Sequence, residues 1–186
     1  MPELTLKKGT NSKSAYNIRN PINDTPKPHT LTILVDNEAG VLARVIGLFS
    51  GRGYNIDSLT VAEVDRDGHR SRVTIVTTGT LSVIDQIKAQ IARIVPVHKV
   101  NDLTEEGTPV ERELALFKVN GKGEKRVEAL RLADVFRANV VDSTLESFTF
   151  ELTGPSDKID AFVDLMQPLG LSELARTGIV ALPRGA

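Results

Sequence analysis

The spacing of apolar residues changes abruptly near residue 40, and this change constrains the fold more than any other feature of the sequence. Leu31, Ile33 and Val35 alternate with their neighbours at a period of two, which is typical of a pleated strand. From Val41 to Phe49 the apolar residues instead recur every three or four positions, as they do on one face of a helix. The sequence therefore predicts a strand, a polar loop and a helix in quick succession.

The segments that follow complete a βαββαβ order. Residues 56–64 and 69–78 alternate as two strands around the Asp-Gly pair at residues 67 and 68, a strong hairpin signal. A helix striped with isoleucine comes next, and a strand at 97–103 closes the unit. With a right-handed crossover, this order gives a four-stranded antiparallel sheet with both helices on one face, which is the ferredoxin-like arrangement.

The second half of the chain repeats this order of elements without clear sequence identity to the first half. We expect a strand at 113–120, a helix at 124–137, strands at 140–145 and 148–152, a helix after Pro155 and a last strand-like segment at 171–182. The prediction is an α+β fold of two tandem ferredoxin-like βαββαβ units. The expected boundaries are a flexible tail at 1–28, a first unit at 29–103, a linker at 104–112 and a second unit at 113–186.

Helices would cover one face of each predicted sheet and leave the other face open. The strand at 31–35 nevertheless carries apolar residues that point both ways. An exposed apolar sheet face or edge usually needs a partner. We therefore expect the chain to dimerise through its N-terminal unit.

Composition narrows the classes of function. The chain has no cysteine, which excludes disulfides, a thiol nucleophile and cysteine-ligated zinc or iron–sulfur sites. Its formal net charge of −1 gives no sign of a nucleic-acid partner or an anionic membrane. No apolar run is long enough to cross a bilayer, and the first residues lack the apolar core of a signal peptide. These features predict a cytoplasmic protein.

No set of catalytic or metal-binding residues emerges from the spacing. The three histidines, His29, His69 and His98, match no metal-ligand motif. RNA-recognition modules share the βαββαβ order and stack bases on strand aromatics. Phe148 and Phe150 alternate on one strand, but a chain with six Phe, two Tyr and no Trp, and without a basic excess, favours core packing for them.

The loop before the first predicted helix could form a small anion site. Asn37 and Glu38 are placed to cap or complement the free N–H groups of the helix start, and Gly40 lets another group approach the backbone. The carboxylate of an amino acid would fit such a helix N-terminus. The same spacing describes an ordinary capped turn, and Asn55 could be an ordinary turn residue, so spacing alone leaves both interpretations open.

A longer run of residues carries more information than these short motifs. Residues 36–50, DNEAGVLARVIGLFS, and residues 52–61, RGYNIDSLTV, closely resemble the regulatory (small) subunit family of acetolactate synthase, whose members contain an ACT domain. The similarity continues through residues 69–103 and, less sharply, to the C-terminus.

This resemblance implies a non-catalytic subunit that binds the catalytic large subunit of acetolactate synthase, activates it and makes it sensitive to feedback inhibition by valine. The reaction condenses pyruvate with pyruvate or 2-oxobutyrate at the start of branched-chain amino-acid synthesis. Thiamine diphosphate, Mg²⁺ and FAD would belong to the partner, and this chain would hold no cofactor or metal. The family also implies an N-terminal ACT domain, an ACT-like C-terminal domain and a homodimer.

The resemblance further assigns an effector site for valine and no catalytic residue. Asn37 and Gly40 would line the site from one subunit, while Asn55 and its neighbours would approach from the other subunit across the ACT dimer. The expected set is Asn37, Gly40, Val41, Leu42, Tyr54, Asn55 and Ile56.

The main alternative is a freestanding ACT-type amino-acid sensor that regulates another enzyme or transcription. A simple sensor would not need the second unit, and this favours the subunit interpretation. The sequence leaves open whether valine, leucine or isoleucine is the main effector, because these side chains differ by a methylene or a branch position. It also leaves open the stoichiometry with the catalytic subunit.

Overall fold

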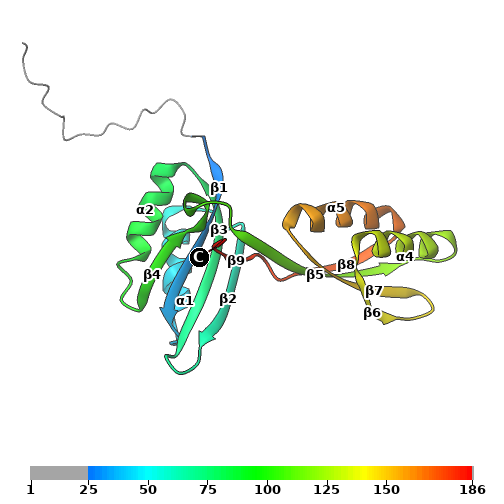
Figure 1. Cartoon of the computed structure of the whole chain (residues 1–186), viewed down its shortest axis with the longest axis horizontal. Helices are drawn as coiled ribbons and strands as arrows, with labels where there is room; N and C mark the ends of the chain where they lie inside the picture. The colour runs from blue at the N-terminus through cyan, green and yellow to red at the C-terminus, as the bar shows by residue number, and fades with distance from the viewer. Residues whose placement is uncertain (1–24, 186) are drawn as a thin grey trace, which may run out of the picture.

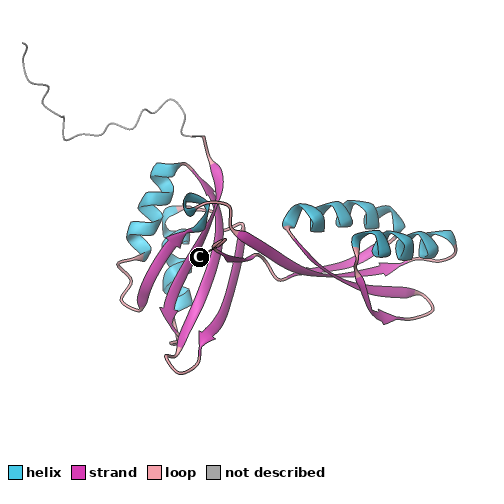
Figure 2. Cartoon of the chain, viewed as in Figure 1, coloured by secondary structure: helices cyan, strands magenta, loops and turns pink. Residues whose placement is uncertain are grey.

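The computed structural model describes residues 25–185 and shows two α+β units joined by one long strand (Figure 1). Each unit has a layer of antiparallel strands with two helices packed on one face, as the colouring by secondary structure makes clear (Figure 2). The tail predicted at 1–28 falls outside the described residues as far as residue 24, and the first strand already begins at Lys27.

The N-terminal unit has its elements in the predicted βαββαβ order. They are β1 (Lys27–Asp36), α1 (Val41–Arg52), β2 (Ser58–Asp65), β3 (Arg70–Gly79), α2 (Leu81–Ile91) and β4 (Val97–Asp102). The strand order across the sheet is β2-β3-β1-β4, and every neighbouring pair is antiparallel. The predicted ferredoxin-like arrangement is confirmed for this unit, and it leaves β2 and β4 as the two edges.

Apolar side chains at the predicted spacings form the core between this sheet and its helices. The strand side contributes Leu31, Ile33 and Ile75, while Phe49 from α1 and Ile87 from α2 pack against them, and all five are at most 1% exposed. Burying such side chains stabilises the fold by about 1.5–3 kcal/mol each. The apolar residues at strand spacing and those at helix spacing therefore pack into one and the same core.

The C-terminal unit repeats the arrangement. Its elements are β5 (Val110–Asn120), α4 (Glu124–Phe136), β6 (Asn139–Ser143), β7 (Ser147–Gly154), α5 (Ser156–Met166), a 3₁₀ turn η2 (Gln167–Leu169) and β8 (Leu171–Arg176). The strand order β6-β7-β5-β8 matches that of the first sheet position by position. Phe117, Phe150 and Phe162 are fully buried together, so the strand aromatics pack the core and do not face outward.

Two segments differ from the sequence prediction. The predicted linker contains a short helix, α3 (Leu103–Glu106), because Asp102 accepts hydrogen bonds from the backbone N–H groups of Thr104 and Glu105. The last strand-like segment is divided into β8 and a separate strand β9 (Val180–Leu182). The division arises because β9 leaves the C-terminal sheet and pairs with the start of β5, from Val110 to Arg112.

The paired segments Val110–Arg112 and Val180–Leu182, called here the β5–β9 ribbon, lie against the helix-free face of the N-terminal sheet (Figure 1). Thr74 and Val76 alternate with the core residues of β3 and so point to this face, yet they are only 4% and 8% exposed. The expectation of an open face is therefore only partly correct, since the chain's own C-terminal segment covers part of it.

Candidate functional site

Gly40 begins helix α1 with a backbone that few other residues adopt. It is the N-cap residue at φ +86°, and no side chain of the described residues caps the helix. A helix start leaves backbone N–H groups without partners inside the helix. A Cβ at Gly40 would meet nothing within 4 Å, so the space beside this helix start is open. This geometry leaves room for the small anion expected from the sequence, and the anion site itself stays a prediction.

The side chain of Asn37 does not cap α1. Its amide Nδ2 donates to Oε1 of Glu63 on β2, over 3.3 Å, and both side chains are exposed. Leu42 is 36% exposed at the first turn of the helix, whereas Val41 is 2% exposed and belongs to the core. Asn37, Gly40 and Leu42 are thus each accessible to solvent near the start of α1, whereas Val41 is part of the core beneath the helix.

The other three predicted residues lie at the opposite end of α1. Gly53 ends the helix at φ +69°, and the next N–H, that of Tyr54, returns to the carbonyl of Phe49. The ring of Tyr54 packs edge-on against Phe49, with centroids 6.3 Å apart. Asn55 donates to Asp57 over 2.5 Å and remains exposed, and Ile56 is half-buried against the core.

These two groups of residues cannot form one site within a single chain. α1 has 12 residues and is therefore about 18 Å long, which separates its two ends by more than the length of an amino acid. The same two groups are also separated by the length of strand β2. Asn55 lies just before the first residue of β2, and Asn37 bonds Glu63, which lies near the end of that strand. The predicted effector residues therefore fall into two groups, one at each end of β2, and we call each group a half-site.

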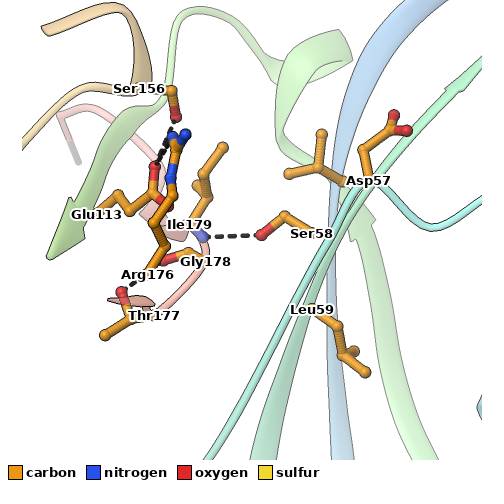
Figure 3. A pocket seen from close by; sticks show the side chains of 10 residues that line it. Asp57, Ser58, Leu59, Glu113, Ser156, Arg176, Thr177, Gly178 and Ile179 are labelled. Carbon is orange, nitrogen blue, oxygen red and sulfur yellow. Dashed lines mark hydrogen bonds and ion pairs between the residues drawn. The ribbon is translucent and has the colours of Figure 1, made fainter. Parts of the chain in front are cut away.

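A cavity of about 490 Å³ lies between the two units, beside the second half-site (Figure 3). Asp57, Ser58 and Leu59 line it from the N-terminal unit, and residues 176–179 line it from the connection between β8 and β9. The backbone N–H of Ile179 donates to the Ser58 hydroxyl over 2.8 Å, and the Thr60 hydroxyl donates to the Ile179 carbonyl over 3.0 Å. We call these two bonds the Ile179 clasp.

Gly178 allows the clasp to form. Its φ is +83°, and a Cβ there would lie 2.7 Å from Ser58 Oγ and 3.1 Å from Thr60 Oγ1. A glycine is needed both for the backbone conformation and for the close approach of the two units. Sequence reasoning missed this position, because a glycine in a short loop looks the same whether or not a distant strand touches it.

An ion pair between the partly exposed Arg176 and the buried Glu113 forms the C-terminal wall of the same cavity. The guanidinium of Arg176 donates from Nε and Nη2 to the two carboxylate oxygens of Glu113, each over 2.6 Å, and from Nη1 to Asp160. Ser156 donates to the same Glu113 carboxylate, which is 4% exposed. The hydrogen bonds to Glu113 raise the pKa of Arg176 above its usual value. The pair therefore serves as a structural contact between β5 and β8.

Two of the histidines are paired with aspartates and not with each other. His29 is 4% exposed, and its Nδ1 lies 2.7 Å from Asp102, whereas His98 approaches Asp36 at the other side of the unit. Among residues 25–185, no group of three or more His, Cys, Asp or Glu side chains is arranged to hold a metal ion. Within the same range, no helix is long and apolar enough to cross a membrane.

Comparison with known proteins agrees with the fold. A family model described as the AHAS small subunit-like ACT domain matches residues 31–99, and a model described as the small subunit of acetolactate synthase matches residues 112–185. The two matches correspond to the two units of the structure.

Individual relatives are similar over nearly their whole length. A probable acetolactate synthase small subunit from Archaeoglobus fulgidus is 49% identical over 157 residues, covering 84% of this chain and 97% of the relative. The isozyme 3 small subunit from Escherichia coli is 45% identical and covers 83% and 94%. The crystal structure of the small subunit from Thermotoga maritima superposes with a TM-score of 0.78 at 39% identity, covering 86% of this chain and 99% of that one.

Proposed function

Because this chain belongs to the family of acetolactate synthase small subunits, we propose that it is a non-catalytic regulatory subunit. It binds the catalytic large subunit, raises its activity and makes it sensitive to inhibition by valine, and it acts in the cytoplasm. The structural observation that supports this proposal most strongly is that the predicted effector residues lie in two groups at opposite ends of β2, so that one complete site would need a second copy of the chain.

Strand β2 is the edge best suited to join two copies. The other edge, β4, presents His98 and Lys99, and charged residues oppose edge pairing. β2 exposes Val61 and Val64, and the carboxylate of its exposed Glu63 accepts a hydrogen bond from Asn37. In a two-fold dimer the same edge serves both subunits, and the two strands run antiparallel. Pairing of β2 with its copy would therefore place Asn55 of one subunit beside Asn37 and Gly40 of the other.

The chemistry of the joined half-sites suits a branched-chain amino acid. The helix start at Gly40 would hold the carboxylate, because free N–H groups and the helix dipole both favour an anion there. The side-chain carbonyls of Asn37 and Asn55 would accept from the ammonium group. Leu42 from one subunit and Ile56 from the other would contact the isopropyl group, as apolar walls do in most ligand sites.

The Ile179 clasp supplies a physical route from this site to the C-terminal unit. Ser58 and Thr60, which hold Ile179, follow Asn55 directly along the chain, and Asn55 bonds Asp57 in the wall of the same cavity. A ligand that fixes Asn55 would favour one position of the C-terminal unit, and that position would in turn favour ligand binding. The coupling free energy is the same in both directions. Inhibition of the distant active site is such a coupling.

The catalytic chemistry is assigned to the large subunit. Thiamine diphosphate, Mg²⁺ and FAD would be bound there, and no step of the reaction is assigned to this chain. The alternative of a freestanding amino-acid sensor shares the same effector site and differs only in its target.

Acetolactate formation by the cognate large subunit, measured alone and with this chain, each with and without valine, tests the proposal. Stimulation that valine reverses is the expected result. If the chain dimerises and binds valine but does not stimulate the large subunit, the regulatory assignment is wrong and the freestanding sensor is favoured.

A further inference from the structure

A second cavity lies on the helix-free face of the N-terminal sheet. It has a volume of about 310 Å³ and is bounded by β2 and β3 on one side and by the β5–β9 ribbon on the other. Ala62 and Val64 line it from the sheet, and Val110, Val180 and Leu182 line it from the ribbon. None of the seven predicted effector residues lines this cavity, so it is separate from the half-sites described above.

The cavity gathers apolar side chains that remain in contact with water. Val64, Val180 and Leu182 are 51%, 49% and 54% exposed, although they come from segments more than a hundred residues apart in the sequence. Single exposed apolar residues are common on protein surfaces, but several that line one recess are typical of a binding site. An apolar group that entered the recess would remove all three from water.

Two arginines line the same cavity, and neither is paired with a carboxylate in the part of the chain that the structure describes. Arg72 on β3 is half-buried, and its guanidinium makes no hydrogen bond or ion pair with any other residue in the range 25–185. Among residues 25–185, the only acceptor for the Arg112 guanidinium is the backbone carbonyl of Glu111, its neighbour in the chain. A guanidinium next to apolar surface loses part of its hydration, and an anion bound there would compensate for that loss.

We propose that this cavity binds an aliphatic monocarboxylate. The tail lies against Val64, Val180 and Leu182, and the carboxylate accepts hydrogen bonds from the guanidinium groups of Arg72 and Arg112. A volume of about 310 Å³ is at the small end of ligand cavities, which favours a short chain of about six to eight carbon atoms. The site goes beyond the regulatory function proposed above and does not depend on it.

Binding of hexanoate and of hexanamide to the full-length chain tests the proposal. The two molecules share one tail and differ in charge, so their ratio of affinities isolates the contribution of the arginines. We expect hexanoate to bind about tenfold more tightly, since a charge-assisted hydrogen bond has this magnitude. Methyl NMR resonances of Val64, Val180 and Leu182 should shift on addition of hexanoate, while those of the buried Val45 should not.

Substitutions of single arginines locate the charge effect. Arg72→Gln and Arg112→Gln should each reduce the preference for hexanoate over hexanamide, and the double variant should abolish it. Arg93→Gln removes the same charge from an exposed position on another part of the unit and should leave the preference unchanged. Thermal unfolding of each variant checks that the sheet stays folded.

Three results would overturn the proposal. The first is equal affinity for hexanoate and hexanamide in the unsubstituted chain, and the second is the absence of binding up to about 10 mM. The third is loss of hexanoate binding together with valine binding in Gly40→Asp, which would place hexanoate in the effector site. Hexanoate binding that persists in Gly40→Asp supports the separate cavity, whether or not the chain regulates acetolactate synthase.

Discussion

Ile179 donates its backbone N–H to the hydroxyl of Ser58, a residue 121 positions earlier in the chain, over 2.8 Å. The Ile179 carbonyl accepts from Thr60 on the same strand, so a single residue near the C-terminus is held by two hydroxyls of β2. Both bonds lie between the predicted effector half-site and the C-terminal unit, and this position makes them the first target for substitution.

Replacing both hydroxyls, in Ser58→Ala with Thr60→Val, should weaken the coupling between valine and catalysis. Each lost hydrogen bond contributes about 1 kcal/mol, so we expect valine to bind within about twofold of normal but to inhibit with on the order of tenfold weaker coupling. Valine affinity by calorimetry and inhibition of acetolactate formation are the two measurements. Thr149→Val, on β7, is the matched control and should change neither; unchanged coupling in the double variant would contradict the proposed route.

Gly178→Ala should destabilise the chain more than Gly185→Ala does. Both glycines have a positive φ, +83° and +81°, so both substitutions introduce similar backbone strain. Only at Gly178 does the new Cβ collide with Ser58 and Thr60, whereas at Gly185 it meets nothing within 4 Å. The difference between the two unfolding free energies, measured in urea, isolates the crowding at the clasp and should be about 1–2 kcal/mol. Equal losses of unfolding free energy in the two variants would show that Ser58 and Thr60 can move away from the new Cβ without destabilising the chain.

Gly40→Asp should reduce valine inhibition far more than it reduces activation of the large subunit. The substitution places a negative charge where the effector's carboxylate is expected to bind, and we predict a loss of valine affinity of at least about tenfold. Gly123→Asp is a close control, because Gly123 is also a helix N-cap at positive φ with open space beside it. A Gly40→Asp variant that remains fully sensitive to valine would remove Gly40 from the effector site.

Arg176→Gln should destabilise the C-terminal unit by about 2 kcal/mol. The substitution leaves the buried carboxylate of Glu113 without its cation, and the cost lies below that of a fully buried pair because the Arg176 side chain is 32% exposed. Lys118→Gln removes an exposed cation paired with Glu173 on the same sheet and should cost less than about 1 kcal/mol. Chemical denaturation of both variants gives the comparison, and similar costs would mean that the Glu113 pair is not held as the structure shows.

Val61→Lys should dissociate the proposed dimer. Val61 lies near the middle of β2 and is 41% exposed, so a two-fold contact through this edge would bring the two introduced ammonium groups close together. Val95→Lys makes the same exchange at a residue that is 95% exposed outside any strand and should leave the mass unchanged. Sedimentation or light scattering measures the oligomeric state. A Val61→Lys variant that keeps the parent's dimer mass would exclude the β2 edge as the interface.

The sequence predicted those helices and strands in which apolar side chains recur at a regular spacing and face one core. Leu31 and Ile33 mark a strand, and Ile84, Ile87 and Ile91 mark a helix, because burial selects apolar residues at the period of the backbone. The half-site residues followed from family resemblance, and the structure shows why they divide into two groups at opposite ends of α1. That assignment of residues to valine stays a prediction.

Features that depend on distant contacts could not be predicted in the same way. The short helix α3 did have a local signal, since Asp102 is followed three residues later by Glu105 in a capping pattern. The pairing of β9 with β5, the Ile179 clasp and the burial of His29 beside Asp102 have no such signal. Each joins residues whose local sequences are compatible with several partners, and only the complete fold selects one.

The route of the final strand has a consequence for how the protein is made. β1 to β4 all precede the second unit in the chain, so the N-terminal unit can fold while the second unit is still being translated. Val180–Leu182, which cover part of its helix-free face, are added only after all four strands of the second sheet's main path. During that interval the growing chain exposes the part of this face that the β5–β9 ribbon later covers, and this is the stage at which the nascent subunit is most vulnerable to association with the wrong neighbour.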